Sequence, residues 1–457
     1  MKKLGFWSIV LLAINSIIGS GIFLSPGAVI SIAGSYTPYV YILAAIFASI
    51  LAVTFAAASK YVNKSGAAYA YATAAFGDNI GFYVGITRFI AACIAWGVMS
   101  TAVVKTVITI FGGDNTNTTL ITIGFLILMV TLLLINITGN KLFEIINNLS
   151  TIGKLLALVT TIVAGIVVIV TTGEVRFSEV THIVDTSKID TTTFVLAIVA
   201  AFYAFTGFES VASGSEDMKN PEKNLPRAIP LAILSIAAVY LGIILVTMAL
   251  NPQALIETKQ VVSLVAVFHS PIIQNIILYG ALISMFGINV AASFSTPRII
   301  EAIANQQQIS PWFKKRTKYD FPFNAFIVTF LIAIIIPMAF QYNMTSIIVL
   351  SSISRFIQFL VVPIGVIVFY YNKNKGTVLE NVKKNVFTDV ILPTISFLFT
   401  IILLVKFNWK GQFSIVEGQH TTLNYFAITA MVIGYIVLPA ILFIVNKMRH
   451  QQSDLKE

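Results

Sequence analysis

Twelve long apolar stretches constrain the fold of this chain more than any other feature. Crossing the hydrocarbon core of a bilayer takes about 20 predominantly apolar residues in a helix. Short segments of alternating polarity, typical of a membrane β-barrel, are not seen. The sequence therefore predicts an all-α polytopic membrane protein with 12 transmembrane helices. The predicted helices lie near residues 6–33, 38–59, 84–110, 119–137, 148–171, 193–216, 228–250, 273–301, 324–340, 346–371, 388–405 and 422–446.

The first apolar stretch begins directly after Met1, Lys2 and Lys3, where a signal peptide would also begin. It is too long for a signal peptide, it lacks a cleavage site of small residues, and eleven further stretches follow it. We therefore interpret it as a retained membrane helix.

The basic residues are distributed unevenly between the two sides of the predicted helices. The net charge is +10, and nineteen Lys and Arg residues lie in the loops on the side of the amino terminus. This excess predicts that both termini are cytoplasmic in a multi-pass protein of a bacterial cell membrane. Because the charges are spread over every alternate loop, a nucleic-acid-binding patch is not expected. The loops on the opposite side carry only Arg176, Lys188, Lys259, Lys406 and Lys410.

Two of the predicted helices are interrupted by turn residues near their middles. The first interruption is "AINSIIGSGIFLSPG" at 13–27, and the second is "AFYAFTGFESVASGSEDMKNPEKNLP" at 201–226. Interruptions in corresponding helices of two halves indicate an inverted-repeat transporter with its site at the bilayer midplane. We therefore expect one five-helix repeat at 1–172, a second at 190–372, and two added helices at 385–447, all in one transport domain. Glycines that serve close helix packing are the alternative.

The interruptions predict a ligand with two opposite charges on one carbon. Backbone groups exposed at a broken helix need partners that lipid does not supply. After Gly19, Ser20 and Gly21, unpaired N–H groups and the serine hydroxyl suit a carboxylate. Unpaired carbonyls around Ile17 and in the segment from Tyr203 to Thr206 suit an ammonium group. A ligand with both groups is an α-amino acid.

Both interrupted segments resemble signatures of the amino acid–polyamine–organocation superfamily of permeases. "IIGSGIFLSPG" resembles the signature of its first helix, and "AFYAFTGFESVASGSEDMKNPEKNLPRAI" that of its sixth. "SGAAYAYATAAFGDNIGF", "NITGNKLFEIINNLSTIGKLLAL" and "RIIEAIANQQQISPWF" match further segments, so the resemblance covers roughly residues 1–340 by motif. The resemblance implies a leucine-transporter-type 5+5 inverted repeat, with broken first and sixth helices and alternating access.

The resemblance also implies which residues hold the substrate. Ser20 and Gly21 would face the carboxylate, and an aromatic ring at Tyr203 would close over the substrate from outside. Phe205 and Phe208 are either substrate contacts or packing residues, and Asn289 either lines the pocket or bonds a neighbouring helix. The predicted substrate-binding set is Ile17, Gly19, Ser20, Gly21, Ile22, Ala92, Trp96, Tyr203, Phe205, Thr206, Gly207, Phe208 and Asn289.

Two basic residues stand deep in predicted helices, where ionisable groups are costly and usually functional. The resemblance implies that Lys154 places its ammonium where sodium-driven relatives hold sodium, and that it takes part in coupling. A lysine reaching back to the cytoplasmic surface is the alternative. Arg355 requires a partner, and we expect either Glu209 as a gate or charge partner, or a substrate carboxylate.

Four other charged residues are expected to be local features of their helices. Arg88 and Lys105 lie closer to the ends of the third stretch, so we expect their side chains to reach the bilayer surface. Arg298 and Glu301 are three residues apart, which is typical of a pair on one helix face.

The favoured function is secondary transport of amino acids, with neutral L-amino acids as the expected class, independent of sodium and driven by exchange or by protons. A polyamine or amino acid/amine exchanger on the same fold is the alternative, followed by an amino-acid-binding receptor. The four histidines lie in loops, ends or the tail without a nucleophile or metal constellation, so an enzyme is not expected. No P-loop, cofactor motif or metal motif is present.

The single cysteine bears on partner proteins. Cys93 lies inside the third apolar stretch and is expected to be a small packing residue. Animal relatives attach a glycoprotein through a cysteine in the loop that here reads "GGDNTNTTL", which has none. The expected partners are therefore a small-molecule substrate and the lipid bilayer, without nucleic acid and without a disulfide-linked subunit.

Overall fold

The computed structural model describes residues 3–19, 21–24, 26–186, 189–257, 262–339, 344–406, 409, 413–417 and 420–454. In this part of the chain, nearly all the ordered structure is helical. The first half contains α1 (Phe6–Ile17), α2 (Gly21–Leu24), α3 (Pro26–Ala33), η1 (Gly34–Tyr36), α4 (Thr37–Tyr61), α5 (Ala68–Phe76), α6 (Asp78–Ile110), α7 (Thr118–Ile137), α8 (Asn140–Thr172), η2 (Phe177–Glu179) and α9 (Val180–Ile183).

The second half begins at the second interruption and ends with the carboxyl-terminal helices. It contains α10 (Thr191–Tyr203), η4 (Phe208–Asp217), α11 (Pro221–Leu250), α12 (Pro252–Glu257), η5 (Ser263–Val267), α13 (Pro271–Asn305), η6 (Pro311–Lys314), α14 (Phe323–Ala339), α15 (Met344–Tyr370), η7 (Phe387–Ile391), α16 (Leu392–Lys406), β1 (Ser414–Glu417), β2 (His420–Leu423), α18 (Tyr425–Val432), η8 (Ile433–Val437) and α19 (Leu438–Asp454).

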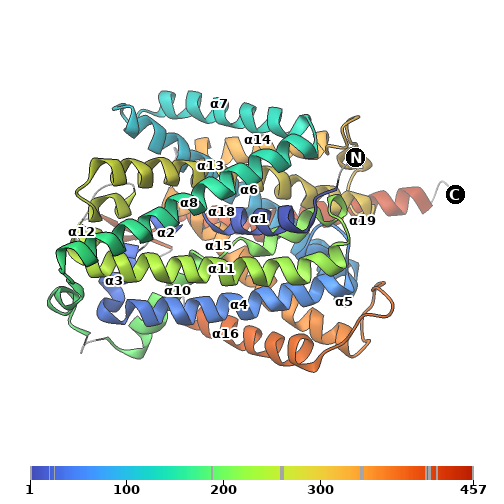
Figure 1. Cartoon of the computed structure of the whole chain (residues 1–457). Helices are drawn as coiled ribbons and strands as arrows, with labels where there is room; N and C mark the ends of the chain where they lie inside the picture. The colour runs from blue at the N-terminus through green and yellow to red at the C-terminus, as the bar shows by residue number, and fades with distance from the viewer. Residues whose placement is uncertain are drawn as a thin grey trace.

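The long helices lie side by side as a bundle, and both chain termini are at the same end of it (Figure 1). We call this the terminal end, and the end that carries α3 and α12 the opposite end. Near the centre, α13 packs against α1, α6, α8 and η4, while α11 packs against α1 and α4. The interrupted segments are therefore enclosed by the longest helices of both halves.

Eight helical segments of the described chain are long and apolar enough to cross a membrane. Four shorter apolar helices, at Phe6–Ile17, Phe323–Met338, Arg355–Tyr370 and Ile433–Met448, fall in four further predicted stretches. The outward faces of α7 and α8 expose apolar side chains such as Ile127, Leu134 and Val170. Lipid accepts such faces without cost, so the chain is a multi-pass membrane protein, and the number of twelve spans stays a prediction.

One short hairpin departs from the predicted all-α fold. Strands β1 and β2 pair antiparallel, with Ser414 opposite Leu423 and Glu417 opposite His420. The hairpin lies between α16 and α18, where the sequence predicts a loop between two membrane helices.

Cys93 is buried within α6.

Candidate functional site

The two interrupted helices meet at the positions where they break. After α1, Ile18 is extended rather than helical, with φ −74° and ψ 95°. After α10, the chain turns at Gly207, whose φ of +122° lies in the region that favours glycine. A Cβ atom built on Gly207 would stand 2.1 Å from the carbonyl oxygen of Ser16. Segments far apart in the sequence are thus in direct backbone contact.

A cavity lies between the two breaks. It encloses about 720 Å³ of empty space, its open mouth included. Side chains and backbone from α1, α2, α6, α10, η4, α13 and α15, and from the segments at the breaks, form its wall. The lining residues are Ser16, Ile17, Gly19, Gly21, Arg88, Ala92, Ala95, Met99, Tyr203, Ala204, Thr206, Gly207, Glu209, Ser210, Ile288, Ala291, Ala292, Ser295, Thr296 and Arg355.

Most of the residues predicted from the sequence line this cavity. The two breaks supply backbone and small side chains, α6 supplies Ala92, and α15 supplies Arg355. Ser20 lies outside the described residues. The predicted residues that line the cavity are Ile17, Gly19, Gly21, Ala92, Tyr203, Thr206, Gly207, Glu209 and Arg355.

Three other predicted substrate contacts are not among the lining residues. Ile22 is fully buried in the core. Trp96 is also buried, with its ring edge-on to Phe326. The Asn289 amide donates to the carbonyl of Met285, and its oxygen accepts a hydrogen bond of 2.6 Å from Ser100. This hydrogen bond joins α13 to α6. Asn289 therefore bonds a neighbouring helix, which was one of the two roles expected for it.

The two phenylalanines of the second interruption pack away from the cavity. Phe205 lies against the ring of Tyr240 on α11, with 5.0 Å between ring centroids. Phe208 stacks on Phe359 of α15 at 6.2 Å and meets Phe55 edge-on. Both are fully buried. In this conformation they support the wall behind the lining residues.

Glu209 is a buried carboxylate with two arginines beside it. Its Oε2 accepts a hydrogen bond of 2.7 Å from the N–H of Gly207, which holds the side chain at the turn. Its Oε1 lies 3.9 Å from Arg88 Nη2 and 3.7 Å from Arg355 Nε. The three side chains come from η4, α6 and α15.

The expectation that Arg88 reaches the bilayer surface is wrong. Arg88 is only 6% exposed, and it lines the cavity. The physical reason is the carboxylate of Glu209, which offers a buried guanidinium a partner that lipid does not. Arg88 was not predicted as a site residue from the sequence. The signal that could have indicated it is Glu209, an acidic residue inside a predicted membrane helix, which needs a basic partner.

Arg355 is bound to the second break from several sides. Its Nη1 donates a hydrogen bond to Thr206 Oγ1. Its guanidinium carbon lies 5.4 Å from the centroid of the Tyr203 ring, within the range of a cation–π contact. Tyr203 itself is 48% exposed. Arg355 therefore lies on the side of the cavity where the wall is most open.

Lys154 is enclosed next to the first break. Its ammonium donates to the carbonyls of Asn15, Ile18 and Ser284, at 3.3, 2.5 and 3.3 Å. It is 0% exposed, so it does not reach back to the membrane surface. Ser284 Oγ also donates to the carbonyls of Ile18 and Gly19. The carbonyls that the first break leaves outside the helix are therefore largely satisfied from α8 and α13.

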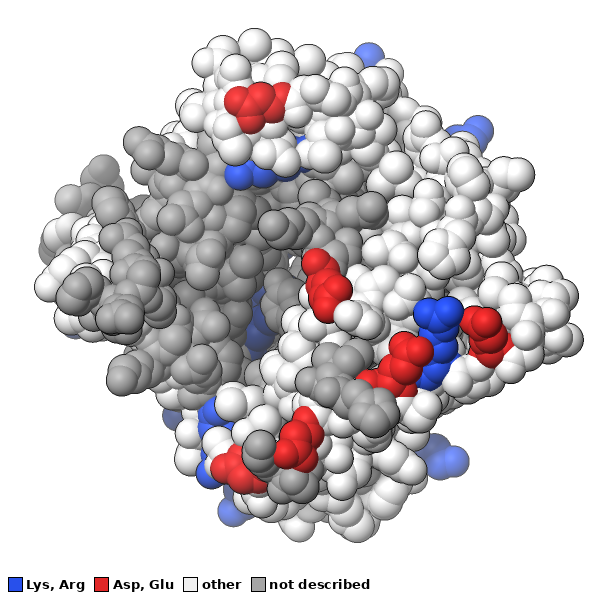
Figure 2. All heavy atoms as spheres, turned by 90° about the vertical axis from the view of Figure 1, so that its left-hand side faces the viewer, with Lys and Arg blue, Asp and Glu red and all other residues white. Residues whose placement is uncertain are grey.

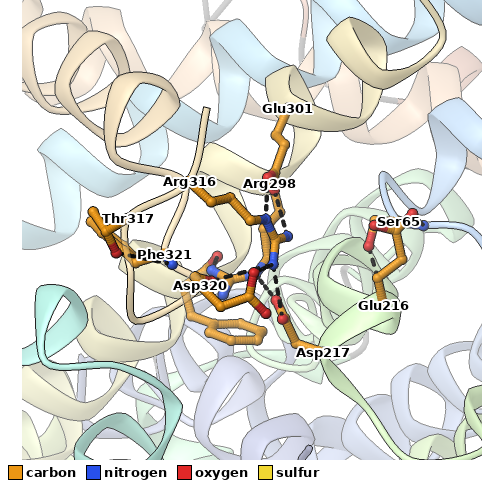
Figure 3. A network of polar contacts seen from close by, with 10 residues as sticks. Ser65, Glu216, Asp217, Arg298, Glu301, Arg316, Thr317, Asp320 and Phe321 are labelled. Atoms are coloured by element: carbon orange, nitrogen blue, oxygen red, sulfur yellow. Dashed lines mark hydrogen bonds and ion pairs between the residues drawn. The ribbon is translucent and has the colours of Figure 1, made fainter. Parts of the chain in front are cut away.

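An ion-pair network joins η4, α13 and the loop before α14 (Figure 3). Asp217, at the end of η4, accepts from Arg298 Nε at 2.5 Å and lies 3.3 Å from Arg316 Nη1. Arg316 also binds Glu301 at 2.5 Å and Asp320 at 3.1 Å. Burial alone would lower the pKa of Arg316, but the hydrogen bond and charge of Glu301, with the charge of Asp217, raise it.

The expected pairing of Arg298 with Glu301 on one helix face is wrong. Each side chain instead pairs with a residue of another element. Arg298 binds Asp217 of η4, and Glu301 binds Arg316 of the loop before α14. The physical reason is that the loop folds back over α13 and brings Arg316 between two acidic residues. The amino-terminal segment is bound to the same network, because the N–H of Leu4 donates to the carbonyl of Asp217 at 2.9 Å.

The opposite end of the molecule is more open. Figure 2 looks onto this end and shows a hollow near its centre, with a basic side chain visible deep inside. Acidic and basic side chains elsewhere on the described part of this face are scattered. Tyr203, which lines the cavity, is 48% exposed.

Replacing Asp217 with asparagine is expected to destabilise the protein strongly. The substitution leaves the buried Arg298 without a full negative charge, and breaking a buried pair costs about 3 kcal/mol. The measurement is the thermal unfolding temperature of the purified protein in detergent. Asp320→Asn is the matched control, because Asp320 binds the same Arg316 but is half exposed. Equal shifts for the two variants would contradict the importance of the buried pair.

The chain is similar to proteins with transport functions over nearly its whole length. The family model described as amino acid permease matches residues 4–438. An uncharacterized transporter of Mycobacterium tuberculosis is 40% identical, covering 97% of this chain and 95% of the relative.

More distant relatives carry names that state a substrate. A serine/threonine exchanger of Bacillus subtilis is 27% identical, covering 67% of this chain and 69% of the relative. A methylthioribose transporter of the same organism is 24% identical, covering 73% of this chain and 74% of the relative.

Within the described chain, no group of three or more His, Cys, Asp or Glu residues is placed to hold a metal ion.

Proposed function

Because the chain belongs to the amino acid permease family, we propose that it is a secondary transporter of amino acids that works by alternating access. The observation that carries this proposal is the contact between two broken helices, with a cavity between them. Backbone groups that no longer serve a helix can bind the charged groups common to all amino acids. The side chains around the cavity then select among amino acids.

In the proposed binding mode, the two breaks hold the two ends of the substrate. The N–H groups around Gly19 and Gly21 receive the α-carboxylate, together with the hydroxyl of Ser20. The carbonyls around Ile17, Tyr203 and Thr206 receive the α-ammonium group. Tyr203 closes over the substrate from the open side. The sequence favours neutral L-amino acids as the substrate class.

Transport would proceed by opening one end of the cavity while the other is closed. The repeats at 1–172 and 190–372 would be the parts that move, with the helices at 385–447 outside the repeat. We propose that the network around Arg316 holds the terminal end closed, since its ion pairs join three elements there. We propose that the terminal end is cytoplasmic and that the chain resides in a bacterial cell membrane.

We propose that coupling does not use sodium. The ammonium of Lys154 supplies one positive charge to carbonyls of α1, of the break and of α13. This charge takes the place that a sodium ion would fill, so transport proceeds by exchange or with protons. A polyamine or amino acid/amine exchanger is the second candidate, but two arginines in the cavity disfavour a polycationic substrate.

Counterflow in proteoliposomes tests the proposal. Vesicles loaded with unlabelled amino acids are expected to accumulate labelled amino acid transiently above its outside concentration, because a transporter exchanges bound substrate. A channel would equilibrate without the transient excess, and a receptor would bind without flux. Protein-free vesicles are the control. If monodisperse, folded protein exchanges none of the protein amino acids, the proposed function is wrong.

A further inference from the structure

The ionisable side chains around the cavity do not balance in charge. Among the described lining residues they are Arg88, Glu209 and Arg355, together with the phenol of Tyr203. Two guanidinium groups and one carboxylate leave one positive charge in excess. Lys154, beside the first break, adds another when it is protonated.

The hydrogen-bonding groups of this cluster are also incompletely used. Glu209 Oε1 and Arg355 Nε have no hydrogen-bond partner among the described residues, although they are buried. The distances of 3.7 and 3.9 Å from Glu209 to the two arginines are too long for hydrogen bonds. Glu209 is held back by the N–H of Gly207, so the carboxylate does not reach either guanidinium closely. Among the described residues, Arg355 Nε therefore lacks an acceptor and Glu209 Oε1 lacks a donor.

A buried positive charge without a counter-charge is unfavourable, and a bound ligand relieves it by supplying the missing anion. A cationic amino acid would raise the excess in the cluster to two charges. A zwitterionic amino acid would leave the excess of one unchanged. With Lys154 left to the carbonyls that it binds, an amino acid with a second carboxylate brings the sum over Arg88, Glu209, Arg355 and the ligand to zero. It also offers two oxygens to a guanidinium fork.

The position of the arginines suits a side-chain subsite. The backbone groups of the breaks serve the α-carboxylate and the α-ammonium in the proposed function. Arg88 and Arg355 come from α6 and α15, away from those backbone groups in the sequence, and both line the same cavity. Arg355 binds Thr206 at the second break, so a second carboxylate there takes a different partner from the N–H groups of the first break that serve the α-carboxylate.

We propose that the cavity is specific for anionic amino acids, with Arg88 and Arg355 binding the side-chain carboxylate. This inference rests on the proposed function and replaces the neutral class that the sequence favours. Glu209 lies beside both arginines and offsets one of their two charges.

The test compares acidic amino acids with their neutral amides, which have nearly the same shape. In counterflow with the full-length protein, L-glutamate or L-aspartate is expected to compete at least about 30-fold better than L-glutamine or L-asparagine. This factor corresponds to the lower limit of the free energy that is lost when one partner of a buried charge pair is removed. Arg355→Gln is expected to reduce this preference by a similar factor, mainly through weaker competition by the acid. Arg88→Gln is a second variant with the same expected direction.

Lys105→Gln is the matched control, because Lys105 lies on α6 with Arg88 but is not among the lining residues. It is expected to keep the preference for acids. Counterflow of neutral amino acids without competition by either acid would overturn the inference and leave the proposed function intact. An unchanged acid preference in both folded arginine variants would also overturn it. Absence of counterflow with every amino acid would instead overturn the proposed function.

Discussion

Replacing Lys154 with alanine is expected to reduce amino-acid uptake to about one hundredth of that of the unmodified protein. The ammonium satisfies carbonyls of Asn15, Ile18 and Ser284, and it joins α8 to the first break and to α13. An unsatisfied buried acceptor costs about 1–3 kcal/mol, and about 3 kcal/mol corresponds to roughly a hundredfold change. The measurement is the initial rate of uptake into proteoliposomes.

Lys105→Ala serves as the control, since this lysine lies in a membrane helix but outside the cavity lining. Its uptake is expected to stay within about twofold of the unmodified protein, as for most substitutions away from a site. The unmodified protein is expected to take up substrate equally in sodium and in choline buffers. Uptake stimulated by sodium would contradict the role proposed for Lys154.

Replacing Gly207 with alanine is expected to abolish transport and to lower the thermal unfolding temperature. The added Cβ would stand 2.1 Å from the Ser16 carbonyl oxygen and 2.8 Å from its carbon. Both atoms are backbone, so a rotamer change does not relieve the clash and the two breaks must separate. The φ of +122° adds strain for any residue with a Cβ. Counterflow and thermal unfolding of the same preparation measure the two effects.

Gly112→Ala separates the clash from the backbone strain. Gly112 also has a positive φ, +72°, but no atom lies within 4 Å of its added Cβ. This control is expected to cost about 1–2 kcal/mol and to keep transport. If Gly207→Ala transported as well as Gly112→Ala, the contact between the breaks would not be part of the transport cycle.

The places where helices break were predictable because they depend on local chemistry. Glycines and a serine in an apolar stretch are visible without any neighbour, and the structure places the turns at Gly19 and Gly207 within the predicted segments. The family was predictable for the same reason, because its motifs lie in these segments. Much of the cavity lining lies in these segments as well, although Ile22, Phe205 and Phe208 of the same segments do not line the cavity.

The partners of Arg298, Glu301 and Arg88 were not predictable from spacing along the chain, although Glu209 was expected as a partner of Arg355 and lies beside it. Arg298 and Glu301 have the separation of a helix pair, yet each binds a residue of another element. Arg88 has the position of a residue near a membrane surface, yet it lies beside Glu209. Periodicity describes one helix at a time, whereas these contacts depend on which helices are neighbours.

By itself, the sequence determined that this is a multi-pass membrane protein of a permease family with two interrupted helices, because hydropathy and turn residues act locally. Only the tertiary structure decided that the interruptions touch and that two arginines lie beside one buried carboxylate. It also decided that four predicted contacts are buried outside the cavity lining: Phe205, Phe208, Trp96 and Asn289. The physical reason is that the charged side chains of a buried site come from several helices. Which of them lie together, and so the net charge of the site, depends on how those helices pack.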